Sequence, residues 1–197
     1  YIEENFGVTA YHAFMQNTCR KNIRNDKPLV GNKYATTDEI KGTEYYYKGA
    51  YVLHMLRYLV GYDVLLETLN DYLYTPKSNN NQTTTKEFIK LLEGNSKMEL
   101  SWFFNQFVYS EKLPTLYSKS RSYKQGEKQF VEMWWAEPMF PLPVEVRYKG
   151  TYAKEKIQIN IGDKPTGISI PSASVLEIDP QKWLLFNNKN FDDIEKN

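Results

Sequence analysis

Apolar residues recur at helical spacing through the first half of the chain. Residues 1–24 predict a helix with a break near Gly7. A second apolar stripe predicts a helix that occupies residues 46–60 and stops at Gly61. The segment between these helices is charged and rich in turn-forming residues, so it predicts a loop.

The pattern continues with helices that have recognisable starts. A helix is predicted for residues 63–74. Thr84 with Glu87 forms a capping-box pattern that opens the next helix, because each side chain can bond the backbone N–H of the other. Ser96 with Glu99 repeats this pattern before a last helix. That helix carries a clear apolar face, made of Leu100, Phe103, Phe104 and Phe107.

After residue 114 the apolar period changes to two, which is typical of strands. Ile157, Ile159 and Ile161 alternate strictly, so one face of their strand is expected to be buried. The predicted strands are LYSKSRSY, QFVEMWW, PVEVRY, EKIQINI, GISI and VLEI (residues 116–123, 129–135, 143–148, 155–161, 167–170 and 175–178). The sequence therefore predicts an α+β chain of two domains, with helices over 1–114 and an antiparallel β-sandwich over 115–190.

Composition and charge narrow the class of protein. Of 197 residues, 41% are hydrophobic and 25% are charged, which leaves enough apolar surface for a packed core. The net charge is +1 with no long run of one sign, which argues against a nucleic-acid partner or an anionic membrane surface. No apolar stretch approaches the roughly 20 residues of a membrane-spanning helix, so no span is predicted.

The sequence carries few candidates for catalysis. Its two histidines, His12 and His54, belong to no HExxH motif or other metal-ligand spacing, and helix packing is their favoured role. A pairing of the single cysteine, Cys19, with a histidine would make a thiol protease site, an alternative with no further support. The chain also contains no GxSxG, phosphate-binding glycine loop or GxGxxG. By itself it therefore lacks a complete catalytic set.

Trp134 and Trp135 raise a different possibility, a sugar-binding platform on the β half. Adjacent strand residues point to opposite faces, so only one of the two indoles can lie on any platform. Packing, either in the core or between domains, is therefore the favoured role for both.

Four landmarks along the chain resemble the zinc aminopeptidases related to aminopeptidase N. YIEENFG and RKNIRNDKPLVG are similar to the family's segment just past its last zinc ligand. Tyr46-Tyr47-Lys48-Gly49-Ala50 matches the family's Tyr-x-Lys-Gly-Ala motif, which begins a helix beside the active site. WFFNQFVYSEKLPTL resembles the family's closing helix and turn, and MFPLPVEVRYKG resembles a strand of the β-sandwich that follows in many members. The resemblance covers nearly the whole chain.

The resemblance implies a fold, a cofactor and a reaction. Residues 1–114 would be the α-helical end of a metallopeptidase catalytic domain, and 115–190 the β-sandwich. In the family, a zinc ion held by HExxH and a later glutamate supports hydrolysis of the N-terminal residue from a peptide substrate. The motif tyrosine, which aligns with Tyr46, hydrogen-bonds the oxyanion of the tetrahedral intermediate. A neutral phenol suits this role because it donates to a developing negative charge while keeping its proton.

A core position is the alternative for Tyr46. Its place on one apolar stripe with Ala50, Leu53 and Leu56 or Arg57 fits a buried ring at a helix start as readily as a catalytic one. The resemblance favours the catalytic role.

The neighbours of Tyr46 in the motif are expected to have no part in the chemistry. Tyr45 and Tyr47 fall outside the motif position, so they are expected to pack or to line a cleft wall. Lys48 is expected to be a solvated charge at the helix start. Gly49 is expected to let a neighbouring backbone approach closely.

The chain also departs from the family pattern. HExxH, the zinc-ligand glutamate and the segment that recognises the substrate amine lie upstream of Tyr1 in the family's order, and none is present. Lys112 and Leu113 stand where members usually carry a glycine and a small or branched residue. We interpret the chain as the C-terminal portion of a longer zinc aminopeptidase whose missing N-terminal domains hold the metal. This chain alone is expected to bind no zinc and to be inactive.

A non-catalytic scaffold or interaction protein is the second interpretation, because a family fold can outlive its chemistry. The upstream sequence separates the two, since an HExxH with a later glutamate supports the enzyme. The residues of the motif resemble those of bacterial relatives for which export is expected, so a periplasmic or secreted location is favoured over a cytoplasmic one. The chain itself shows no targeting signal.

Overall fold

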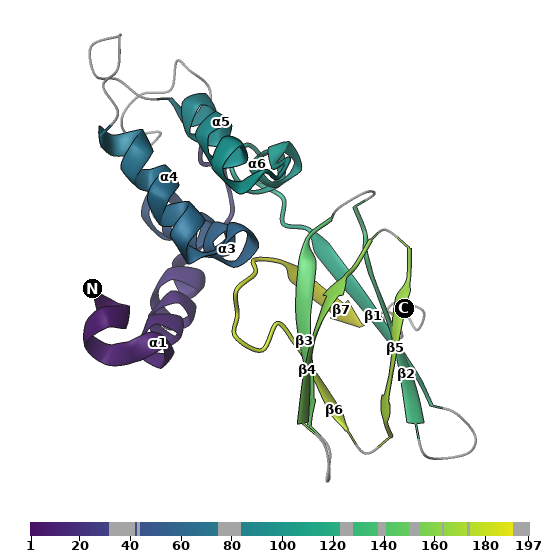
Figure 1. Cartoon of the computed structure of the whole chain (residues 1–197). Helices are drawn as coiled ribbons and strands as arrows, with labels where there is room; N and C mark the ends of the chain where they lie inside the picture. The colour runs from purple at the N-terminus through teal and green to yellow at the C-terminus, as the bar shows by residue number, and fades with distance from the viewer. Residues whose placement is uncertain are drawn as a thin grey trace. The chain divides into compact units, whose positions relative to one another are not determined.

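The chain forms two compact units, Tyr1–Lys112 and Leu113–Asn197. Their structure is a computed structural model that describes residues 1–31, 42, 44–74, 84–122, 128–137, 141–149, 154–162, 164–172 and 174–190. The first unit is built from helices and the second from strands (Figure 1). This order of elements confirms the predicted α+β class.

The helical unit is an array of short helices joined by two π-helical turns. Helix α4 packs beside α5, and α3 lies against both α4 and η2. Within the described residues, no helix has the length and apolarity needed to cross a membrane. The elements are α1 (Ile2–Phe14), η1 (Met15–Arg20), η2 (Glu44–Lys48), α3 (Gly49–Val60), α4 (Tyr62–Tyr74), α5 (Thr85–Ser96) and α6 (Ser101–Phe107).

Two glycines set the limits of the predicted helices. Gly7 has φ 83° and ψ 167° and kinks α1 where the sequence predicts a break. Gly61 has φ 89°, and its N–H donates to the Arg57 carbonyl at 3.1 Å, which ends α3. Both φ values are positive, and glycine adopts them without the steric cost that a Cβ imposes.

One of the two predicted capping boxes is present. Glu87 N–H donates to Thr84 Oγ1 at 3.2 Å, and Thr84 N–H donates to Glu87 Oε2 at 2.7 Å, which confirms the first box. The prediction of a second box at Ser96 and Glu99 is wrong. Ser96 is still inside α5, and α6 begins after Leu100 without a side-chain cap.

The predicted apolar face of α6 forms part of the core of the helical unit. Leu100, Phe103 and Phe107 have no exposed surface, and Phe104 is 2% exposed. The rings of Phe103 and Phe107 lie 4.9 Å apart between centroids. Full burial of a side chain of this size contributes roughly 1.5–3 kcal/mol to folding.

The β unit contains two sheets, with strand orders β5-β2-β1-β7 and β4-β3-β6. The predicted strands coincide with β1 to β6 to within one residue at each end. In these strands the pairs β1–β2, β2–β5, β3–β4 and β3–β6 are antiparallel, as predicted. The strands are β1 (Thr115–Ser122), β2 (Lys128–Trp135), β3 (Pro143–Lys149), β4 (Lys154–Asn160), β5 (Thr166–Pro171), β6 (Val175–Ile178) and β7 (Asn187–Asn190).

Strand β7 lies outside the predicted set, and it corrects the purely antiparallel picture because it pairs parallel to β1. Its sequence, NNKN, has no apolar period from which a strand could be inferred. The segment is held as a strand by its neighbour: Thr115 pairs with Asn187 and Ser118 with Asn190. The N–H of Asn187 also donates to the Pro114 carbonyl at 2.9 Å.

Trp135 links the two sheets through the interior of the β unit. Its side chain is 1% exposed, and its Nε1–H donates to the carbonyl of Leu142, which lies just before β3, at 3.3 Å. The Phe186 ring meets the indole edge-on at 5.7 Å. Trp134, on the other face of β2, packs at 5.7 Å from Tyr117 of β1. The burial of Trp135 leaves it no surface for stacking on a sugar.

Gly167 of β5 lies beneath the ring of Phe130 on β2, and a Cβ there would overlap the ring. Because the Phe130 ring would have to leave its position, we expect Gly167→Ala to lower the free energy of unfolding of the β unit by about 1–3 kcal/mol. Gly162→Ala is the matched control, since its Cβ would meet only the Lys164 backbone nitrogen, at 3.9 Å. Equal urea midpoints for the two variants would contradict this packing.

Candidate functional site

The π-helical turn η2, with sequence EYYYK, leads directly into α3. Single π-helical turns are rare, and many occur at functional sites. The two end residues of the turn are buried, Glu44 at 2% exposed and Lys48 at 0%. Tyr45 and Tyr46 between them are 55% and 65% exposed. The turn therefore has charged, buried ends and an exposed aromatic crest.

Glu44 anchors the first end of the turn to a neighbouring segment. Its Oε1 accepts hydrogen bonds from the backbone N–H groups of Arg24, at 2.5 Å, and Asn25, at 2.9 Å. Asn25 has a positive φ of 56°, so the backbone turns at the residues whose N–H groups bond the Glu44 carboxylate. The Asn25 amide in turn donates to the Glu111 carbonyl. Glu44 thereby fixes the start of η2 to the end of the first helical segment.

Lys48 anchors the second end, and its position corrects the expectation of a solvated charge. Its Nζ donates to the backbone carbonyl of Ser110 at 3.0 Å and to that of Lys27 at 3.4 Å. Burial lowers the pKa of Lys48, while the negative charges of Glu44 and Glu111 act in the opposite direction. The Lys48 side chain is thus packed in the interior, and its ammonium connects η2 to the backbone at Lys27 and at Ser110.

Tyr46 lies at the crest of the turn rather than in the core. Its ring meets that of Tyr45 edge-on, at 5.4 Å between centroids and an interplanar angle of 88°. The predicted stripe is correct at Leu56, which is fully buried, and wrong at Tyr46 and at Leu53, which is 38% exposed. The buried face of α3 is formed by Tyr51, Val52, Met55 and Leu56.

The shift of the buried face has a local cause. A π-helical turn has more residues per turn than an α-helix, so it changes which positions after it share a face with Tyr46. At Gly49, the first residue of α3, an added Cβ would meet no heavy atom of the described residues within 4 Å. Within that part of the chain, the expected close approach of a neighbouring backbone is not found.

A second cluster of polar and aromatic side chains lies between α1 and α3. The Tyr11 hydroxyl and His54 Nδ1 are 2.7 Å apart and share a hydrogen bond. His12 meets His54 edge-on at 5.6 Å, and Tyr51 meets His54 at 5.2 Å. Burial is the main reason that the pKa of Tyr11 is raised. These contacts make helix packing the observed use of both histidines.

Arg57 and Glu3 form a bidentate ion pair beside this cluster. The guanidinium donates to the carboxylate at 2.5 Å and 2.9 Å, and its carbon lies 5.1 Å from the Tyr11 ring centre. The hydrogen bond from Arg57 is the main reason that the pKa of Glu3 is lowered. The pair links the N-terminal turn of α1 to α3.

We expect Glu3→Gln to lower the free energy of unfolding of the helical unit by about 0.5–1 kcal/mol at pH 7, the value of a well-aligned, partly exposed pair. Because the folded pKa of Glu3 is lowered, this contribution is present above the unfolded value and is lost as the pH falls through the folded one. Wild type and variant should therefore converge as the pH falls through the folded pKa of Glu3, which lies below the ordinary value for a glutamate. Thermal unfolding across pH tests this, with Glu4→Gln as the control.

Cys19 does not have the properties of a nucleophile. Its side chain is buried in η1, and burial raises the pKa of its thiol. A raised pKa keeps the group protonated, whereas a catalytic cysteine needs thiolate character at neutral pH. The thiol protease alternative therefore has no support in the structure.

No metal centre is found among the described residues. In that part of the chain, no three or more His, Cys, Asp or Glu side chains are grouped so that they could hold a metal ion. The donor set needed for catalytic zinc, three protein ligands with an open position, is thus not provided by these residues.

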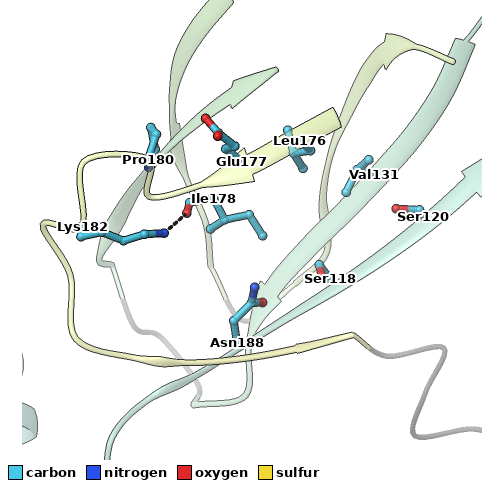
Figure 2. A pocket seen from close by; sticks show the side chains of 9 residues that line it. All are labelled: Ser118, Ser120, Val131, Leu176, Glu177, Ile178, Pro180, Lys182 and Asn188. Atoms are coloured by element: carbon cyan, nitrogen blue, oxygen red, sulfur yellow. Dashed lines mark hydrogen bonds between the residues drawn. The ribbon is translucent and has the colours of Figure 1, made fainter. Parts of the chain in front are cut away.

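A hollow of about 410 Å³ lies between the two sheets of the β unit (Figure 2). Ser118 and Asn188 line it on one side and Ile178 of β6 on the other. Its charged groups are engaged: Lys182 Nζ donates to the Ile178 carbonyl at 3.4 Å, and Glu177 pairs with Arg147. The hollow holds no arrangement of nucleophile, base and orienting group, so the tyrosine turn stays the stronger candidate.

Sequence reasoning misses the two anchors of the tyrosine turn. Glu44 stands outside the motif, and the sequence places Lys48 in solvent. Both are charged residues, and charged residues are seldom buried unless paired, so composition gives no signal of their burial. The motif spacing, with Lys48 two residues after Tyr46, is the one available signal.

The chain is similar in structure to aminopeptidase A of Legionella pneumophila, whose crystal structure was determined in complex with aspartic acid. The TM-score is 0.62 at 14% sequence identity, so the likeness shows a shared fold. The match covers 95% of this chain and 22% of the other, so the chain spans about a fifth of the length of the Legionella protein. No curated protein matches the sequence of the chain.

The model of the peptidase family M1 domain matches residues 3–107. This range is more than half of the chain, and it includes the tyrosine turn with both of its anchors. The match confirms the resemblance to aminopeptidase-type metallopeptidases that the sequence motifs indicated. The chain belongs to peptidase family M1.

Proposed function

We propose that this chain is part of a zinc-dependent aminopeptidase, in which Tyr46 donates a hydrogen bond to the oxyanion formed during hydrolysis of an N-terminal peptide bond. The observation that carries this proposal is the placement of Tyr46. The ring is 65% exposed on a turn whose two ends are buried and hydrogen-bonded. A core tyrosine would have a buried ring instead.

The chemistry asked of Tyr46 is within reach of a phenol. A neutral hydroxyl donates to the oxygen that gains negative charge when water attacks the carbonyl carbon, and the phenol keeps its proton. Such a donor is effective when it is held in place before the reaction, because no reorganisation is then needed as charge develops. The buried ends of η2 supply that rigidity.

Family M1 peptidases are generally zinc-dependent, and the described residues of this chain provide no set of ligands for the metal. We therefore assign zinc binding to residues outside the described part of the chain and derive no step through the metal. The sequence contains no HExxH motif, so we expect the chain by itself to hydrolyse no peptide.

Each unit has its own part in this proposal. The helical unit, up to about residue 114, would be the end of a catalytic domain and would present Tyr46 to the substrate. The sandwich of residues 115–190 would have a structural role outside the chemistry, since its hollow carries no catalytic set. A scaffold that kept the fold without the metal is the alternative, and it is favoured if the full-length protein binds no zinc.

The proposal is tested by removing one hydroxyl. Tyr46→Phe in the full-length protein keeps the ring and deletes the donor, and Tyr45→Phe does the same at the neighbouring exposed tyrosine. We expect activity to fall in the first variant and to be retained in the second. Equal activity in both variants would refute the role of Tyr46.

A further inference from the structure

We infer that Glu44 and Lys48 are positioning residues that hold Tyr46 at the place where it acts. This inference rests on the proposed function of Tyr46. Both residues flank the exposed crest of η2, and both side chains are buried. They do not need to touch the substrate to influence the chemistry.

The hydrogen bonds of the two anchors set the position of the turn. Glu44 receives the backbone N–H groups of Arg24 and Asn25, and Lys48 Nζ donates to the backbone carbonyls of Lys27 and Ser110. These partners are main-chain atoms, which move less freely than the ends of side chains. The turn is thus fixed at both ends against the segment at residues 24–27, with Ser110 as a third point.

Burying charge at both ends is a costly way to pack a turn. An isolated charge is strongly disfavoured in a protein interior, and apolar residues of similar size often give equal or higher stability than buried charged groups. Directional hydrogen bonds from charged groups, however, specify geometry in a way that apolar packing does not. We therefore expect the anchors to matter more for where Tyr46 lies than for whether the unit folds.

A small error in the position of Tyr46 should be costly for catalysis. A displacement of about 1 Å at a reacting centre can reduce a rate by roughly 10²-fold. If the anchors position Tyr46, losing one should reduce kcat, while KM for the substrate changes little.

The test uses Lys48→Met, which keeps the length of the side chain, removes the donor and leaves no buried charge at this position. In the chain, 3-fluorotyrosine at position 46 reports the environment of that ring by 19F NMR. We expect the resonance to split or broaden in Lys48→Met. In the full-length protein we expect kcat to fall by about 10- to 100-fold with KM little changed.

Thr68→Val is the matched control, because Thr68 is also fully buried and its Oγ1 donates to the Val64 carbonyl at 2.8 Å. Thr68 Oγ1 also accepts from Asn95 Nδ2 at 3.1 Å, so the variant removes two polar contacts of α4 and none of η2, and it should leave the resonance and kcat as in wild type. If Lys48→Met does not fold, Glu44→Leu replaces it, since leucine has no acceptor for the N–H groups of Arg24 and Asn25 and leaves no buried charge.

The outcomes separate this inference from the proposed function. An unchanged resonance with an unchanged kcat in the anchor variant would overturn the inference, and so would equal effects from Thr68→Val. A changed resonance with an unchanged kcat would also overturn it, provided that Tyr46→Phe lowers kcat in the same assay. If Tyr46→Phe has no effect, the proposed function fails, while the resonance still decides whether the anchors hold the ring.

Discussion

Tyr46→Phe is expected to lower kcat/KM of the full-length protein on an aminoacyl-anilide by about 10²- to 10³-fold. This is the typical effect of removing one hydrogen-bond donor from an oxyanion, about 2.7–4 kcal/mol of barrier. The ring, its exposure and the fold of the turn should be preserved, because only the hydroxyl is removed. The measurement is steady-state kinetics on both proteins, with zinc content determined in each.

Tyr45→Phe provides the control for this prediction. Tyr45 lies next to Tyr46, is 55% exposed, and its ring meets that of Tyr46 edge-on. The Tyr45→Phe variant therefore removes a hydroxyl from the same exposed surface. We expect less than about a threefold change in kcat/KM, since no donor to the oxyanion is removed. A Tyr46→Phe enzyme that keeps its zinc and nearly all of its activity would contradict the role proposed for Tyr46.

Trp135→Ala is expected to lower the free energy of unfolding of the β unit by about 3–5 kcal/mol, the range for truncating a large buried aromatic residue. Trp135 is 1% exposed, bonds the Leu142 carbonyl through its indole and meets the Phe186 ring. Removing the indole leaves a cavity between the sheets and an unbonded carbonyl. Urea unfolding with hydrogen exchange measured for each unit separates this loss from any change in the helices.

Trp134→Ala is the control for Trp135, because it deletes the same side chain from the opposite face of the same strand. Trp134 is partly exposed and packs on Tyr117 across the β1–β2 pair. A partly exposed aromatic pair contributes about 0.5–1.5 kcal/mol beyond its buried area, and its truncation leaves no enclosed cavity, so the expected loss is smaller. Equal losses for the two variants would show that Trp135 does not hold the sheets together.

The elements that the sequence predicts correctly are those with a strong local signal. The break at Gly7, the stop at Gly61 and the Thr84–Glu87 capping box are each caused by residues within a few positions of one another. Strand β2 shows the two-residue period most clearly, because Val131, Met133 and Trp135 lie buried on one of its faces. Local chemistry is sufficient in these places.

The elements that the sequence does not reveal depend on contacts made elsewhere in the chain. The polar segment NNKN forms strand β7 because its backbone pairs with the edge of β1. Ser96 and Glu99 have the spacing of a capping box, yet α5 continues through Ser96 and takes that residue out of the cap position. Neither outcome can be read from a window of the sequence.

The candidate site is predictable in part. The resemblance to a family motif selects Tyr46, but periodicity alone places it on a buried stripe, and the π-helical turn removes it from that stripe. Glu44 and Lys48 escape sequence reasoning because burial of a charge depends on backbone partners at residues 24–27 and 110, which are distant in the sequence. Their identification needs the tertiary structure.

The affinity of a tetrahedral inhibitor tests the central claim about Tyr46 most directly. A phosphinic dipeptide resembles the transition state, and a substrate-like amino acid amide resembles the ground state; both can be measured on wild type and Tyr46→Phe. If the hydroxyl acts on the oxyanion, the inhibition constant of the phosphinate should rise by the same factor as kcat/KM falls, while binding of the amide stays unchanged. An unchanged phosphinate affinity in a folded, zinc-loaded Tyr46→Phe protein would contradict the account.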